Sequence, residues 1–273
     1  MSKYETHAAY PASGLAAAQT ALLTLWPSFS PYHQDLVLVG GLAVHYLTRH
    51  RTDSPWPGVV TTDVDFGIEL SAENGQYGSV RTAMEGLGFH ADAQAAGRLV
   101  RQVENMNLYV DFLTEAPPAI TGTRRVDDVL ASVFPGINRA LAARRMVTIT
   151  GQDIYGATAS CDVAMADIGP LLVLKINAFG GPTGRQRPKD AYDVLQAVTA
   201  FVDGPQAAIA AFHAEAGQGN TGYETACQAL RRYFIHPDAA APARAAAFLR
   251  AFSDDQQRIR EDLVSTARFL LGE

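Results

Sequence analysis

The chain has 273 residues, enough for one large domain or two modest ones. Hydrophobic residues make up 48% of it and charged residues 18%, a composition typical of folded globular proteins rather than disordered or fibrous ones. The formal net charge is −6. This excludes a general attraction to polyanions, so any contact with nucleic acid has to come from local basic clusters.

The first predicted element is an apolar helix over residues 14–26, between Pro11 and Pro27. No charged residue lies between Glu5 and Asp35, as in buried segments. The apolar stretch is far shorter than the roughly 20 residues that span a bilayer. Its small residues precede its leucines, whereas a signal-peptide cleavage site would follow them. We therefore expect a buried helix, no membrane contact and a cytoplasmic protein.

The rest of the chain changes character near Asp167. Before it, short β-branched runs alternate with turns and helical stretches, and after it alanine-rich helical periodicity takes over. The first part predicts a mixed α/β sheet, with strands over 36–39, 61–70, 99–103 and 108–113 and helices over 42–50 and 77–87. The second part predicts a helical bundle, with helices over 168–179, 188–202, 205–216, 223–233, 242–252 and 254–271. We predict two domains, over residues 1–165 and 166–273.

The most informative segment is the run of residues 61–70, in which polar and apolar residues alternate. Successive side chains of a strand point to opposite faces, so Asp63 and Asp65 share the face opposite Val64 and Phe66. Two neighbouring carboxylates repel each other, and a divalent cation with oxygen ligands is the usual way to make such a pair favourable. The alternative is an edge strand with a solvated acidic face.

A second alternating strand, residues 107–113, places Asp111 opposite an apolar face. If the two strands are neighbours, Asp63, Asp65 and Asp111 converge and can hold two Mg²⁺ ions about 3.5–4 Å apart, the arrangement used for in-line phosphoryl displacement. The alternative for Asp111 is an aspartate that ends a strand at a turn.

Upstream, residues 37–39 form a strand that delivers Gly40 and Gly41 to the start of a helix. Glycines there let the backbone approach phosphate oxygens closely, with the N–H groups of the helix end aimed at the anion. A Gly-Gly pair after a strand is also common in simple turns.

In this order, Gly40-Gly41, Asp63-Val64-Asp65 and Asp111 resemble the nucleotidyltransferase superfamily typified by DNA polymerase β. The resemblance implies a nucleotidyltransferase-type mixed sheet with flanking helices over residues 1–165. It also implies that the glycines contact the phosphates of the incoming NTP and that all three aspartates bind metal, the third also helping to activate the acceptor. We expect Thr61, two residues before the first aspartate, to bind nucleotide as well.

A narrower resemblance lies in residues 171–179 and 185–194. They are similar to AbiEii-type toxin nucleotidyltransferases, which carry a lysine late in an apolar helix, a basic loop and a Lys-Asp-x-x-Asp helix start. Many of these belong to bacterial type IV toxin-antitoxin or phage-defence systems. The resemblance implies a catalytic and nucleotide-binding role for Lys175 and nucleotide binding by Lys189, Asp190 and Asp193.

The residues around Lys175 leave a second interpretation open. Its helical neighbours Leu171, Leu172 and Phe179 are apolar, so its ammonium group needs an anion, either a phosphate or a carboxylate. Asp190 and Asp193 lie three apart on one helix face and can supply the carboxylate. Lys175 is then part of an ion pair that joins two helices.

The sequence therefore predicts a Mg²⁺-dependent nucleotidyltransferase that moves NMP from an NTP to an acceptor hydroxyl, as the toxin of a toxin-antitoxin pair. The acceptor stays open between a tRNA end, a protein side chain and a small molecule, and so does the existence of a cognate antitoxin. One alternative is an enzyme acting on an aminoglycoside-like small molecule. Another is a catalytically inactive module that binds a nucleotide or a partner. That module is favoured by Val59, where the family often has arginine, and by an apparent insertion over 52–58.

Overall fold

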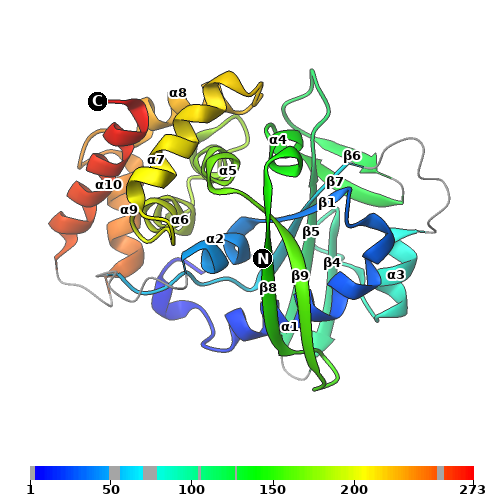
Figure 1. Cartoon of the computed structure of the whole chain (residues 1–273). Coiled ribbons are helices and arrows are strands. Elements are labelled where there is room, and N and C mark those ends of the chain that lie inside the picture. Colours follow the sequence, from blue (N-terminus) through cyan, green and yellow to red (C-terminus); the bar gives the residue numbers. More distant parts are fainter. Residues whose placement is uncertain (1–3, 49–55, 70–78, 104–105, 127, 251–254) are drawn as a thin grey trace. The chain divides into compact units, whose positions relative to one another are not determined.

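The structure is a computed structural model that describes residues 4–48, 56–69, 79–103, 106–126, 128–250 and 255–273 (Figure 1). The chain divides into two compact units. The sheet unit comprises Ala12–Ala43 and Thr61–Asp167, and the helical unit comprises Met1–Pro11, Val44–Val60 and Ile168–Glu273. The predicted domain division after residue 165 stays a prediction, because a contact unit is not by itself a part that folds alone.

The sheet unit is built from strands, several helices and connecting turns. Its elements are α1 (Gly14–Ser28), η2 (Ser30–Tyr32), β1 (Leu36–Val39), β2 (Asp63–Ile68), α3 (Val80–Gly86), β3 (His90–Ala91), β4 (Arg98–Val103), β5 (Met106–Thr114), β6 (Thr123–Val126), β7 (Val129–Val133), α4 (Ile137–Ala142), β8 (Arg144–Gln152) and β9 (Thr158–Ala166). Within the described residues the strand order is β3-β4-β5-β2-β1-β9-β8, and β7 pairs with both β5 and β6. The order places β2 and its aspartates between β1 and β5.

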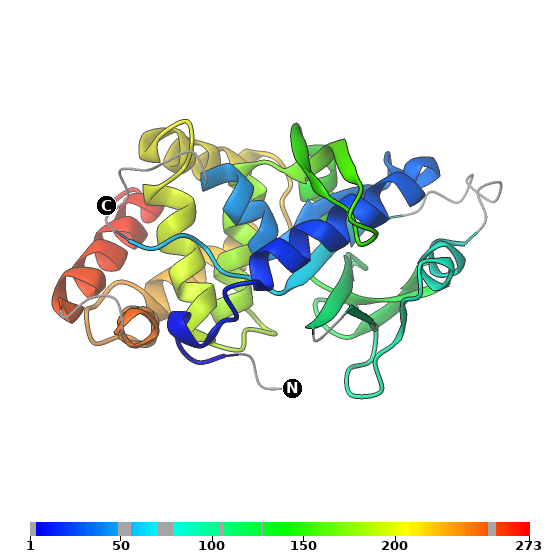
Figure 2. The same ribbon diagram turned by 90° about the horizontal axis from the view of Figure 1, so that it is seen from below.

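One face of this sheet is closed by α1, which contacts β2, β5, β8 and β9 (Figure 2). Helix α1 packs on this face because the alternation in β2 directs its apolar side chains there, and Val64 and Phe66 are fully buried. The ring of Phe66 packs against those of Trp26 and Phe29, and burial of such aromatic side chains stabilises the layer. On the opposite face α4 packs against β2 near Gly67. The same face carries the aspartates, two and four residues earlier along β2.

The helical unit contains η1 (His7–Ala9), α5 (Ile168–Gly180), α6 (Pro188–Thr199), α7 (Pro205–Ala214), η3 (Glu215–Gly217), α8 (Tyr223–Tyr233), α9 (Ala240–Leu249) and α10 (Gln256–Leu271). Nearly every residue of α5 is buried, and α5 contacts α6, α7 and α8 (Figure 1). A helix that is apolar on all sides is stable only when other helices surround it. Segment 57–58 belongs to this unit, since the Pro57 carbonyl accepts a hydrogen bond from Tyr192 and the Gly58 carbonyl one from His7.

The predicted fold class is confirmed: a mixed α/β sheet with helices is followed by an all-helical region from α5 to α10. The bounds of β1 and α8 agree with the prediction, whereas the helix predicted over 42–50 begins two residues earlier and is α2 (Gly40–Thr48). The prediction for 77–87 corresponds to α3, whose N-cap Ser79 accepts a hydrogen bond from the Thr82 N–H, and residues 77–78 lie outside the described residues. In the described part of the chain no helix is both long and apolar enough to cross a membrane.

Candidate functional site

The two acidic strands are neighbours in the sheet. Strand β2 pairs in parallel with β5, with Asp65 opposite Asp111 and Asp63 opposite Tyr109. Directly opposite residues share a face, so the structure brings Asp63, Asp65 and Asp111 onto one surface. Asp63 is buried, with 2% of its surface exposed, while the Asp111 side chain is 25% exposed. Asp111 is therefore more accessible to a ligand than Asp63.

The glycine pair lies beside this acidic surface. Strand β1 is antiparallel to β2 and places Val39 opposite Asp65, and the chain then enters α2 at Gly40. Gly40 has φ +73°, and a Cβ on it would lie 1.9 Å from Oδ2 of Asp65. Only glycine fits there, both in conformation and in space. Gly40 and Gly41 also form the N-terminus of α2, where backbone N–H groups favour an anion.

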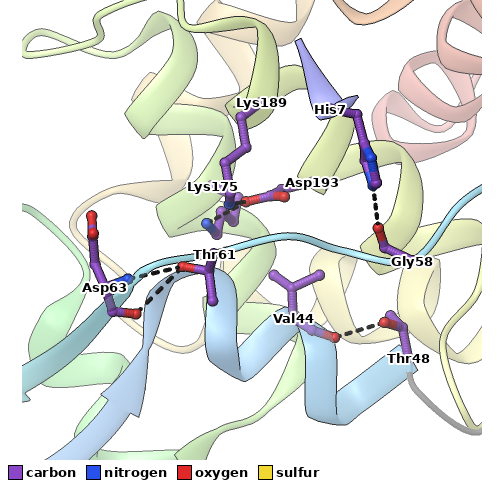
Figure 3. Close-up of polar contacts among 9 residues, drawn as sticks. All are labelled: His7, Val44, Thr48, Gly58, Thr61, Asp63, Lys175, Lys189 and Asp193. Carbon is purple, nitrogen blue, oxygen red and sulfur yellow. Dashed lines mark hydrogen bonds and ion pairs between the residues drawn. The ribbon is translucent and has the colours of Figure 1, made fainter. Parts of the chain in front are cut away.

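Two threonines hold Asp63 in place. The Thr62 hydroxyl donates a 2.8 Å hydrogen bond to Oδ1 of Asp63. The buried Thr61 hydroxyl donates to the Asp63 carbonyl and accepts from the Asp63 N–H, both at 3.4 Å (Figure 3). These contacts position the start of β2, so Thr61, predicted to bind nucleotide, supports the first aspartate in this structure.

The acidic surface contains a cation that the sequence reading missed. Arg98, the first residue of β4, lies opposite Asp111 in the antiparallel pairing with β5. Its guanidinium donates to both carboxylate oxygens of Asp111, at 2.9 and 2.5 Å, and lies 3.5 Å from Oδ2 of Asp63. It also stacks over the ring of Tyr109, 4.9 Å from the centroid. Such a two-bond arginine–carboxylate contact is among the strongest ion pairs in proteins.

The charge of Arg98 is fixed by its surroundings. Burial alone would lower its pKa, but the hydrogen bond and charge of Asp111, and then the charges of Asp63 and Asp65, outweigh burial and raise the pKa above its ordinary value. Arg98 therefore stays protonated. These three carboxylates and the guanidinium together carry a formal charge of −2.

The chemistry of the aspartates fits Mg²⁺, because carboxylate oxygens are the hard donors that this ion prefers. In the described conformation, however, the Arg98 guanidinium holds Asp111 and Asp63. Among the described residues no group of three or more His, Cys, Asp or Glu side chains is arranged to hold a metal ion. The aspartates thus fit the ion by ligand type, whereas their arrangement among the described residues is not that of a metal site.

A second polar cluster lies in the helical unit and consists of Lys175 on α5 with Lys189 and Asp193 on α6 (Figure 3). Oδ2 of Asp193 lies 2.6 Å from Nζ of Lys175 and 2.5 Å from Nζ of Lys189. Both lysine side chains are 8% exposed and Asp193 is fully buried. The structure thus contains the lysine–aspartate ion pair that the sequence allowed, and its carboxylate is that of Asp193.

Asp190 takes no part in these two contacts. It lies in the first turn of α6 and is 9% exposed, and its Oδ2 accepts no hydrogen bond from any described residue. The structure brings Lys175, Lys189 and Asp193 together and leaves Asp190 beside them on α6.

The electrostatics of Asp193 follow from this arrangement. Burial would raise the pKa of Asp193, but the charges of Lys175 and Lys189, together with their hydrogen bonds, outweigh it and hold the pKa below its ordinary value. The carboxylate is therefore ionised at neutral pH and paired with both ammonium groups.

No protein-family model and no curated protein matches this chain. The resemblances drawn from the sequence therefore stay predictions. Residues 52–55 of the apparent insertion lie outside the described residues, and Val59 is buried at 3% exposure.

The sequence did not predict Arg98 as a site residue, because the residues around it indicate only the start of a strand. The signal that could have found it is the hairpin of β4 and β5, since once Val103 pairs with Met106 the register places Arg98 opposite Asp111. Opposite charges directly across a hairpin stabilise each other.

Proposed function

We propose that this protein is a Mg²⁺-dependent nucleotidyltransferase that transfers NMP from an NTP to an acceptor hydroxyl. The observation that carries the proposal is the alignment of three neighbouring strands, in which Val39 lies opposite Asp65 and Asp65 opposite Asp111. This register brings the glycine-led start of α2 and the three carboxylates to one surface.

Each group then has a chemical task. Asp63, Asp65 and Asp111 would hold the metal, which when bound neutralises charge on the triphosphate and on the leaving pyrophosphate. The N–H groups at Gly40 and Gly41 bind phosphate oxygens. Asp111, the more exposed carboxylate, accepts a hydrogen bond from the acceptor hydroxyl and helps to remove its proton. For Lys175, in the helical unit, the narrower resemblance implies a catalytic and nucleotide-binding role.

For the biological setting we propose a toxin of the AbiEii type, acting in the cytoplasm with a tRNA end as acceptor and a cognate antitoxin as partner. The narrower resemblance in residues 171–179 and 185–194 supports this setting. An aminoglycoside-like small molecule is the alternative acceptor.

A second candidate is a catalytically inactive module that binds a nucleotide or a partner protein. One observation favours it: Arg98 already neutralises part of the charge on Asp63 and Asp111, as a structural ion pair would. In that case the aspartates need no metal.

The test is a transfer assay with the full chain, Mg²⁺, each α-³²P-labelled NTP in turn and a total tRNA pool. The variant Asp63→Asn/Asp65→Asn serves as the inactive form, because asparagine keeps the shape of each side chain and removes its charge. Glu85→Gln, at an exposed carboxylate of the same unit, is the matched control.

We expect label in RNA with the unmodified protein and with Glu85→Gln, and none with the double variant. Label on an added aminoglycoside, but not on RNA, would support the small-molecule alternative. Equal labelling by the double variant would refute metal-dependent catalysis by these aspartates. Absence of transfer to any acceptor would favour the inactive module.

A further inference from the structure

The helical unit contains a pocket of about 240 Å³ at the start of α6. Four of the side chains that line it are cationic, and they come from three places: Arg185 and Arg187 from the segment before α6, Lys189 from its first turn and Arg244 from α9. Among the described residues that line it, Glu5 is the one carboxylate, and its side chain is exposed. Lys189 is already paired with Asp193. The exposed guanidinium groups of Arg185 and Arg244 line the same cavity, and an anion bound there would lower their mutual repulsion.

The donors of two of these arginines remain available to a ligand. Arg244 uses Nη1 to donate a 2.7 Å hydrogen bond to the Gln186 carbonyl, which leaves most of its five N–H donors. Arg185 is exposed and makes no side-chain hydrogen bond, ion pair or ring contact with any described residue. Guanidinium groups that are not already paired bind phosphate through two parallel hydrogen bonds.

The backbone at the start of α6 adds to the positive potential of the pocket, and its hydrogen bonds fix the segment that carries the arginines. Helix α6 has 12 residues, its first residue, Pro188, lines the pocket, and its N-cap residue, Arg187, makes no side-chain capping hydrogen bond. The helix N-terminus therefore contributes partial positive charge beside the pocket, part of which the carboxylate of Asp190 in the same turn offsets. The preceding loop is fixed to the end of α5, because the N–H groups of Arg185 and Gln186 donate to the carbonyls of Ala178 and Phe179. The cationic groups are therefore positioned before a ligand arrives, which lowers the entropic cost of binding.

The size of the pocket limits what it can enclose. Pockets that hold whole small molecules measure roughly 300–1,000 Å³, so about 240 Å³ suits one anionic part of a ligand rather than an entire nucleotide. The wall formed by Tyr4 and Tyr10, whose ring centroids lie 4.9 Å apart, is aromatic and carries no charge. The ligand class that matches these features is a run of phosphate groups.

We propose that this pocket is a polyphosphate-binding site that takes either the phosphates of a nucleoside triphosphate or successive phosphates of an RNA strand. Binding of phosphate depends on the pocket alone, whereas the choice between these two sources rests on the proposed function. The proposal adds Arg185, Arg187 and Arg244 to the binding residues and requires no metal.

The test uses inorganic tripolyphosphate as the probe, with EDTA present and the full chain in an isothermal titration. The variant Arg185→Ala/Arg244→Ala removes two exposed guanidinium groups, which leaves the core unchanged. Arg268→Ala, an exposed arginine on α10, is the matched control. We expect the affinity of the unmodified protein for tripolyphosphate to fall as the salt concentration rises. The affinity should be about a hundredfold lower in the double variant, or about tenfold lower per arginine. Arg268→Ala should bind tripolyphosphate with unchanged affinity.

The variant Asp63→Asn/Asp65→Asn separates this proposal from the proposed function, since it should lose transfer and keep tripolyphosphate binding. Competition then identifies the source: displacement of tripolyphosphate by NTP in EDTA indicates a nucleotide, and displacement by single-stranded RNA without a 5′ phosphate indicates RNA. The proposal is overturned if the unmodified protein does not bind tripolyphosphate, if Arg185→Ala/Arg244→Ala binds it as well as the unmodified protein, or if neither NTP nor RNA displaces it.

Discussion

Replacing Asp193 with asparagine should destabilise the helical unit strongly. The substitution keeps the shape of the side chain but removes the charge that lies 2.6 and 2.5 Å from two ammonium groups. Both lysine side chains are only 8% exposed, so water cannot replace the carboxylate. Removing one partner of a buried ion pair typically costs about 3–5 kcal/mol, because the remaining charge stays buried and uncompensated. We expect a loss of that size in the free energy of unfolding.

The measurement is urea denaturation at pH 7 followed by far-ultraviolet circular dichroism, to which helices contribute most. The matched control is Asp238→Asn in the same unit, which breaks the 3.0 Å ion pair with Arg260 at a side chain that is 79% exposed. Exposed pairs contribute about 0–1 kcal/mol, so the control should change little. If Asp193→Asn costs no more than Asp238→Asn, the reasoning about the buried cluster is wrong.

Three further outcomes follow from the same contacts. The difference in unfolding free energy between the unmodified protein and Asp193→Asn should stay constant from pH 8 to 5 and shrink below about pH 4. The reason is that a carboxylate with a lowered pKa stabilises the folded state only while it is ionised, so protonation removes that stability. Denaturation at several pH values measures this difference. Gly40→Ala should cost about 1–3 kcal/mol more than Gly122→Ala in thermal unfolding, since both have positive φ but only Gly40 meets a side chain. Arg98→Met should lower the melting temperature, and millimolar Mg²⁺ should restore it by binding the released aspartates, whereas the unmodified protein should respond less.

The sequence was sufficient for the elements with regular periodicity. The alternation in residues 61–70 predicted β2, and the glycines and prolines between the helices of the second part marked α5 to α8 closely. It was insufficient for β6 to β9, whose exposed faces mix charged and apolar residues. Strand β8, for example, carries Arg144 and an exposed Met146 on a surface that short-range patterns do not identify. Pairing with a distant strand decides such segments, and local propensity does not.

In the candidate site, too, patterns within one segment were predictable from the sequence, whereas contacts between distant segments were not. The alternation placed Asp63 and Asp65 on one face, but only the sheet register shows that Asp111 lies beside Asp65. The role of Arg98 depends on two pairings at once, β4 with β5 and β5 with β2, so no single segment reveals it. Likewise, the sequence offered both Asp190 and Asp193 to Lys175, and helix packing selects Asp193.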